Sequence, residues 1–159
     1  MSALFGIRAL APPRVPVALA FLLFGLMPIA VADSARRAQA DWAARPLEER
    51  IALVRKANEI IGQDTGRMAT ELAHQMGRPI RYGGEFGGFS ERLTYMADIA
   101  AESLAPDVIE DSDAFHWMIK RVPWGVVLVV APWNYPYMTA INTVAPALIA
   151  GNSVILKHA

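Results

Sequence analysis

The sequence predicts an α/β fold in which an N-terminal layer of helices packs on a strand-helix-strand unit. Before residue 106, apolar residues recur at steps of three and four, the spacing of helices that bury one face. After residue 125, two short apolar runs at 126–130 and 153–157 flank a segment of helical length. Apolar runs without alternation are typical of parallel strands that are covered on both faces. The chain has 159 residues, which is within the range of one domain.

The first part of the chain, residues 1–32, differs from the rest. Arg8 and Arg14 precede an uncharged stretch at 15–32 that ends in small residues, a pattern typical of a secretory signal and close to the shortest membrane span. We weigh three interpretations: an unrelated or misassigned leader, a signal or membrane anchor, and ordinary core. We therefore separate this leader from residues 33–159, and expect a cytoplasmic protein without membrane contact unless the leader is a real anchor.

Four helices are predicted before the strands. Asp33 or Ser34 is expected to cap the first, Pro46 to start the second, and Asp64 to cap a third that ends at Gly77. The fourth is expected to end near residue 106. The expected apolar faces of the second, third and fourth helices are, in order, Leu47, Ile51, Val54, Ala57 and Ile61; Met68, Leu72 and Met76; and Phe89, Leu93, Met96 and Ala100.

The segments around the fourth helix carry no binding motif. Residues 83–88 are rich in glycine but lack the G-x-G-x-x-G order, a preceding strand and a following Lys-Ser/Thr, so they predict a turn and a helix start. Residues 107–113 are acidic without the spacing of a calcium loop, and they predict an exposed loop. Residues 114–122 predict a strand.

The strand-helix-strand unit begins with the apolar run Val126–Val130. Pro132 and Pro136 interrupt this strand, and Pro136 suits the first position of a helix that is expected to run to Ala150. Gly151 and the residue after it then end the helix.

The second strand of the unit is predicted at Ser153–Lys157, parallel to the first and reached by a right-handed crossover. Ligands gather at the carboxyl ends of parallel strands. Residues 132–134 and Lys157 are therefore predicted to lie at a binding site.

Two motifs in this unit resemble the NAD(P)-dependent aldehyde dehydrogenase superfamily. They are PWNYP at 132–136 and PALIAGNSVILK at 146–157, and their separation also agrees with that family. The resemblance covers about residues 33–159, or roughly the first third of a family enzyme. It implies N-terminal helices packed on the opening βαβ unit of an aldehyde-dehydrogenase-type modified Rossmann domain, which is incomplete in this chain.

The resemblance also implies roles for individual residues. Asn134 matches the asparagine whose side-chain amide donates to the substrate oxygen, which becomes an oxyanion when a cysteine thiolate attacks. Lys157 matches the lysine that binds the adenosine ribose hydroxyls of NAD or NADP. The backbone of Val130, Ala131, Pro132 and Trp133 is expected to line the nicotinamide side of the cofactor site. Family members are homo-oligomers, and the region of residues 114–122 contributes to their contacts.

The composition limits what this chain does by itself. It contains no cysteine, so it has neither a disulfide nor a thiol nucleophile, and its formal net charge of zero does not favour nucleic acid. Its three histidines lack metal-ligand spacing, so no metal site is expected. We expect the N-terminal part of an oxidoreductase that converts an aldehyde into a carboxylic acid. The alternative is a non-catalytic remnant or partner-binding fragment, tethered to a membrane if the leader is an anchor.

Overall fold

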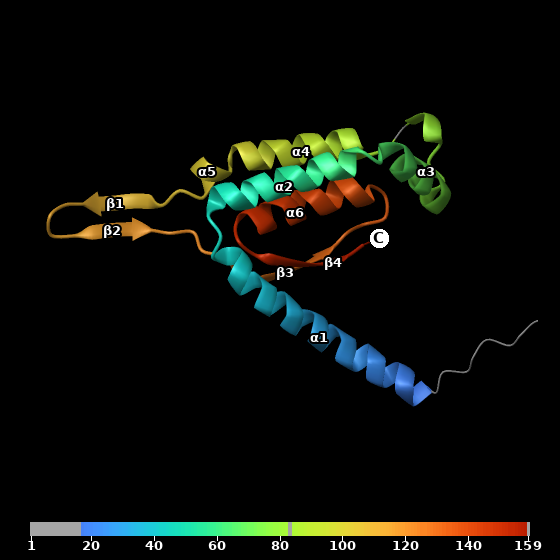
Figure 1. Ribbon diagram of the computed structural model, residues 1–159, viewed down its shortest axis with the longest axis horizontal. Coiled ribbons are helices and arrows are strands. Elements are labelled where there is room, and N and C mark those ends of the chain that lie inside the picture. The colour runs from blue at the N-terminus through green and yellow to red at the C-terminus, as the bar shows by residue number, and fades with distance from the viewer. Residues whose placement is uncertain (1–16, 83, 159) are drawn as a thin grey trace, which may run out of the picture.

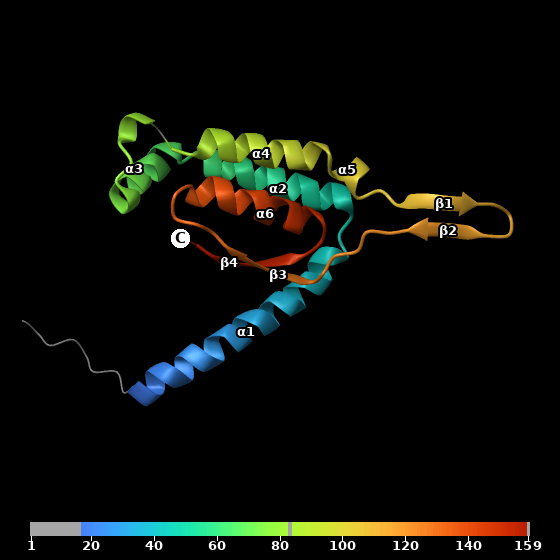
Figure 2. The same cartoon turned by 180° about the vertical axis from the view of Figure 1, so that it is seen from behind.

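The computed structural model describes residues 17–82 and 84–158, and its elements lie in layers (Figure 1; Figure 2). Helix α6 lies in the middle, between one face of the parallel sheet β3-β4 and the helices α2 and α4. Helix α1 crosses the other face of this sheet, and the hairpin β1-β2 projects from the side. The predicted α/β class is thus confirmed. The bounds are α1 (Val17–Ala43), α2 (Leu47–Gly62), α3 (Thr65–Met76), η1 (Ile80–Tyr82), α4 (Phe86–Asp98), α5 (Ala100–Ser103), β1 (Asp107–Asp111), β2 (His116–Ile119), β3 (Val126–Val130), α6 (Pro136–Ile149) and β4 (Ser153–Lys157).

Helix α1 is continuous through the position where the sequence predicts a helix start. The prediction that Asp33 or Ser34 caps a helix is therefore wrong. The reason is that no glycine or proline interrupts residues 29–43, and the last turns dock on the start of β4, where Ser153 Oγ donates to Ala35 O at 2.9 Å. The predicted division after residue 32 falls inside this helix. Residues 1–16 of the leader lie outside the described residues.

None of the helices within residues 17–82 and 84–158 has the length and hydropathy needed to span a bilayer.

The α2 helix follows Pro46 as predicted, but its inner face differs by one residue. Ala57 is exposed, and Asn58 is half-buried instead, donating from Nδ2 to Ser90 Oγ of α4 at 2.8 Å. A polar pair thus lies in the interface between α2 and α4, where the sequence pattern predicts an apolar contact.

The α3 helix begins and ends where predicted, but the residue at its N-cap does not cap it with a side-chain hydrogen bond. Asp64 occupies the cap without a side-chain cap bond and pairs with Arg67 instead. Gly77 ends the helix with φ of 71°, a left-handed conformation that favours glycine.

The fourth predicted helix is divided into α4 and α5 near Ile99. Its predicted face is largely confirmed, because Phe89, Leu93 and Ala100 are buried. These residues belong to the main core between α2, α4, α5 and α6, whose buried members are Val54, Phe89, Leu93, Ala97, Ala100, Ile141, Ala145 and Ile149.

The acidic segment after α5 forms a strand, which corrects the predicted loop at residues 107–113. Its β-branched Val108 pairs with Met118 of β2 in an antiparallel hairpin, and Arg121 Nη2 donates to Asp107 Oδ2 at 2.9 Å. The acidic side chains of β1 are exposed to solvent, so the strand forms without burying their charges. β2 confirms the strand predicted within 114–122.

The strand-helix-strand unit matches the sequence prediction almost to the residue. β3 and β4 are parallel, with Val126 opposite Ser153 and Val130 opposite Lys157, and α6 begins at Pro136 as expected. The helix ends at Ile149, one residue earlier than predicted.

The turn between α6 and β4 is held by one buried side chain. Asn152 Oδ1 accepts from Gly125 N at 2.9 Å, and its Nδ2 donates to Ala147 O at 3.1 Å. Gly151, with φ of 92°, supplies the left-handed conformation that reverses the chain.

The C-terminal carbonyls of α6 receive donors from the N-terminal helices. Trp42 Nε1 donates to Leu148 O at 2.7 Å, and Arg50 Nε donates to Ile149 O at 2.9 Å. The arginine also places a positive charge at the negative end of the helix dipole. α1 and α2 therefore fix the position of α6 relative to the sheet.

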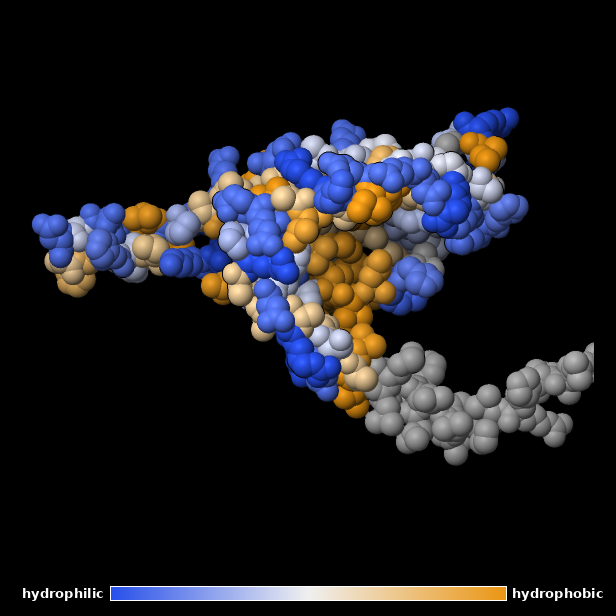
Figure 3. Space-filling view, in the orientation of Figure 1, coloured by the Kyte–Doolittle hydropathy of each residue, from blue (hydrophilic) through white to orange (hydrophobic). Residues whose placement is uncertain are grey.

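One face of the sheet remains open. Leu128 and Val130 of β3, whose side chains share one face of the sheet, are 65% and 66% exposed. Figure 3 shows an apolar surface in the hollow between α1 and the helical layer, where the sheet lies. The sequence predicts cover on both faces, and among the described residues this face lacks it beyond α1.

We expect the chain expressed by itself to self-associate through this face, because large exposed apolar patches and open strand edges promote association. Leu128→Glu should lower both self-association and the binding of a hydrophobic dye, as measured by light scattering and fluorescence. Leu53→Glu is the matched control, since Leu53 is an exposed leucine (41%) on α2. Equal effects of the two substitutions would contradict a role for the sheet face.

Candidate functional site

The turn between β3 and α6 lies at the carboxyl end of the sheet. Ala131 N donates to Lys157 O at 3.0 Å, which extends the pairing of Val130 with Lys157. The structure thus brings together three of the residues predicted for the cofactor site. Ala131 is buried, whereas the Lys157 side chain is exposed and its ammonium can reach a ligand at this edge.

A cavity of about 780 Å³ opens at the same end of the sheet. This volume lies within the range of small-molecule binding sites. Its lining comes from α3, the turn, α6 and the end of β4, and consists of Leu72, Gln75, Met76, Ala131, Trp133, Pro136, Tyr137, Ala140, Leu156 and His158. Of the predicted site residues, Ala131 and Trp133 line it, whereas Asn134 and Lys157 lie outside the lining.

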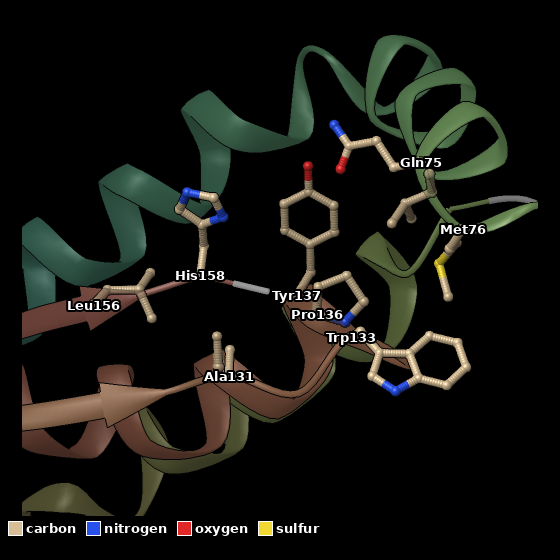
Figure 4. A pocket seen from close by; sticks show the side chains of 10 residues that line it. Gln75, Met76, Ala131, Trp133, Pro136, Tyr137, Leu156 and His158 are labelled. Atoms are coloured by element: carbon tan, nitrogen blue, oxygen red, sulfur yellow. The ribbon is translucent and has the colours of Figure 1, made fainter. Parts of the chain in front are cut away.

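The cavity has an apolar wall with a few polar groups. Leu156 and His158 bound it at one end and Gln75 and Met76 at the other, with the Tyr137 ring between them (Figure 4). Burial raises the pKa of Tyr137 above its usual value, and the negative charge of Glu71 raises this pKa further. The phenol is therefore neutral at physiological pH and can donate a hydrogen bond to a ligand.

Asn134 is held by its main chain and presents its side chain to solvent. Its carbonyl oxygen accepts from Arg78 Nη2 at 2.8 Å, and the residue is exposed. Within the part of the chain that the structure describes, its side-chain amide forms no hydrogen bond with another residue. Two amide N–H donors therefore remain available for an oxygen atom that approaches the turn.

A buried ion pair lies directly behind this turn. Glu85, whose side chain is 1% exposed, accepts from Arg78 Nη1 at 2.9 Å with its Oε1. Its Oε2 accepts from the backbone N–H groups of Tyr137 and Met138, at 3.0 Å each.

Sequence reasoning missed this pair. It interpreted Glu85 as part of a glycine-rich turn and helix start, and it gave Arg78 no part in the site. One local signal was present, because Glu85 is the single charged residue in the run 83–88. The partner at Arg78 and the contact with α6 depend on tertiary packing.

Among the described residues, no group of three or more histidine, aspartate or glutamate side chains could hold a metal ion.

Comparisons with known proteins agree on one family. The family model described as "Aldehyde dehydrogenase family" matches residues 29–159. The chain is 40% identical over 133 residues to the benzaldehyde dehydrogenase [NAD(+)] of Pseudomonas putida, covering 80% of this chain and 26% of that protein. It is 33% identical over 135 residues to the NADP-dependent glyceraldehyde-3-phosphate dehydrogenase of Pisum sativum, covering 80% and 27%. It thus spans about a quarter of the length of these curated relatives.

A solved structure shows the same likeness in three dimensions. The NADP-dependent glyceraldehyde-3-phosphate dehydrogenase of Bacillus halodurans C-125, complexed with NADP, superimposes with a TM-score of 0.71 at 29% identity. The match covers 80% of this chain and 28% of that structure.

Proposed function

Because the chain belongs to the aldehyde dehydrogenase family, we propose that it forms the N-terminal part of an enzyme that oxidises an aldehyde to a carboxylic acid with NAD or NADP. The observation that carries this proposal is the arrangement at the carboxyl end of the sheet. Asn134 lies in the turn after β3 with its side-chain amide available, and Lys157 ends the neighbouring strand.

Asn134 is proposed to stabilise negative charge on the substrate oxygen. When a thiolate attacks the aldehyde carbon, the electron pair of the C=O bond moves to oxygen, and an amide N–H can donate to the resulting oxyanion. The amide carries no charge to desolvate and does not lose its proton to the oxyanion. Since the chain contains no cysteine, the thiolate belongs to a part of the enzyme outside these residues.

The carboxyl end of the sheet is proposed to hold the beginning of the cofactor site. The residues fit such a group, because an exposed lysine and an exposed turn, Pro132–Trp133, adjoin a cavity with an apolar wall. Lys157 would donate to the ribose hydroxyls, and the backbone of Val130, Ala131 and the turn would line the nicotinamide side. A bound NAD or NADP supplies the acceptor for the hydride that leaves the substrate.

The hairpin β1-β2 is proposed to contribute to contacts between subunits. Val108, Trp117 and Ile119 are between 55% and 61% exposed, and large apolar side chains gathered on one exposed element are typical of an interaction surface. Burial against a second subunit would remove this surface from water.

The alternative function, a partner-binding fragment without catalysis, draws on the open sheet face. Leu128 and Val130 could bind a separate protein as well as the rest of an enzyme. A fusion protein distinguishes the two. The full 159-residue chain is joined to the part of the P. putida benzaldehyde dehydrogenase that follows its matched segment. We call this fusion the hybrid enzyme. Benzaldehyde-dependent turnover by it supports the enzyme assignment, and a folded but inactive hybrid enzyme favours the alternative.

Lys157→Ala should weaken cofactor binding in the hybrid enzyme by about tenfold, because it removes a charge-assisted hydrogen bond to the ribose. The loss should be larger for NADP than for NAD, since the ammonium also attracts a 2′-phosphate. Titration of both cofactors by fluorescence measures these affinities, and kcat at saturation should change little. Lys120→Ala, at an exposed lysine away from this edge, is the control. An unchanged affinity in Lys157→Ala would remove Lys157 from the cofactor site.

A further inference from the structure

We infer that Arg78 and Glu85 are positioning residues for Asn134, and that the catalytic contribution of its amide depends on their ion pair. The inference rests on the proposed function, in which Asn134 donates to the reacting oxygen. It adds two residues that neither touch the substrate nor belong to the motif that contains Asn134.

Glu85 acts as an external cap for α6. The residue at the N-cap, Tyr135, makes no side-chain cap bond, so the first N–H groups of the helix need another acceptor. Glu85 Oε2 accepts from the N–H groups of Tyr137 and Met138, at 3.0 Å each. A carboxylate at this end also interacts favourably with the helix dipole. One side chain from the start of α4 thus fixes the first turn of α6.

Arg78 connects this cap to the turn that carries Asn134. One guanidinium nitrogen donates to Glu85 at 2.9 Å and the other to the Asn134 carbonyl oxygen at 2.8 Å. The guanidinium also lies over the Tyr135 ring, 4.6 Å from its centroid. Two donors in a rigid fork can hold two acceptors at once, whereas a lysine ammonium lacks this planar geometry.

The pair is largely buried, and a small cavity of about 220 Å³ adjoins it. The Arg78 side chain is 17% exposed and the Glu85 side chain 1% exposed, so each charge needs the other as its partner. Gly88 on α4 lies against α6, and a Cβ at Gly88 would be 2.8 Å from Met138 Sδ. The close approach of the two helices keeps the carboxylate within reach of the α6 N-terminus.

The consequence concerns the direction of one side chain. The pair holds the Asn134 carbonyl, the Tyr135 ring and the N–H groups of residues 137 and 138 at the same time. These contacts fix the chain on the C-terminal side of the Asn134 Cα atom, and Ala131 N, which donates to Lys157 O at 3.0 Å, holds it on the N-terminal side, so Asn134 has a defined Cα–Cβ direction. A displacement of the donor by about 1 Å can reduce a rate by about 10²-fold.

The test is a double-mutant cycle in the hybrid enzyme. Arg78→Lys and Glu85→Gln should each lower kcat by about tenfold or more, with the KM for NAD changing less than about twofold. If Arg78 acts through Asn134, Arg78→Lys should have almost no further effect on kcat in an Asn134→Ala background. A purely structural role would lower kcat equally in both backgrounds, and this result would overturn the inference. If Asn134→Ala alone leaves kcat unchanged, the proposed function fails instead.

Arg92→Lys is the matched control. Arg92 also links α4 to α6, through Nη1 and Asn142 Oδ1 at 2.9 Å, but at an exposed position away from the turn. It should leave kcat unchanged in both backgrounds.

A second measurement does not require activity. In the full chain fused to a soluble carrier protein, Glu85→Leu removes the acceptor for the first N–H groups of α6. Hydrogen exchange of the peptide spanning residues 134–141 should become about tenfold faster, whereas the α2 peptides should stay unchanged. Unchanged exchange at residues 137 and 138 would overturn the inference, whatever the hybrid enzyme does.

Discussion

We expect Asn134→Ala to lower kcat of the hybrid enzyme by about 10²–10³-fold, equivalent to about 2.7–4 kcal/mol of barrier, the usual effect of removing one oxyanion donor. The Asn134 amide forms no hydrogen bond within the described residues, so its removal leaves no buried partner unsatisfied. The cofactor KM should stay nearly constant, because the amide acts on charge that develops during the reaction.

The measurement is steady-state turnover of benzaldehyde at saturating NAD, with cofactor affinity determined separately by titration. Asn142→Ala is the control, since Asn142 is an exposed asparagine on α6 whose side chain accepts from Arg92. If Asn134→Ala weakened cofactor binding and Lys157→Ala lowered kcat, the two assigned roles would be exchanged. An unchanged kcat in Asn134→Ala would exclude the oxyanion role.

The prediction of the site from sequence is accurate where nearby residues determine the local structure. The bounds of β3 and β4 and the start of α6 agree with the prediction, because proline and glycine act within a few residues of where they stand. Asn134 and Lys157 could be placed at one edge of the sheet for the same reason. Their placement follows from the length of the crossover and the parallel register.

Features that depend on distant partners could not be predicted in this way. Helix α1 continues past Asp33 because its last turns dock on residues more than a hundred positions later. The Arg78 and Glu85 pair depends on contacts with the turn and with α6, which are 52 to 56 positions away. A lone acid in a glycine-rich segment indicates a helix start equally well when no such contact exists, so the pattern alone does not distinguish the two cases.

The position of α6 links the scaffold to the site. Trp42 and Arg50 bind the carbonyls at its C-terminal end, and Glu85 binds the N–H groups at its N-terminal end. The N-terminal helical layer therefore fixes the helix that begins two residues after Asn134. On the role that we infer for Arg78 and Glu85, residues that do not touch a reacting atom are expected to affect the rate through this helix.

The largest change in activity is expected between the chain alone and the hybrid enzyme. The purified 159-residue chain should show no aldehyde-dependent reduction of NAD or NADP above a blank, because it contains no cysteine to form the thiolate. The C-terminal portion of the P. putida enzyme alone should also be inactive, since it lacks the counterpart of Asn134. Only the hybrid enzyme is expected to produce reduced cofactor, which is followed by nicotinamide absorbance. Turnover by the isolated chain that survives repurification would contradict this and would require a different nucleophile. Turnover by the C-terminal portion alone would show that the segment carrying Asn134 is dispensable.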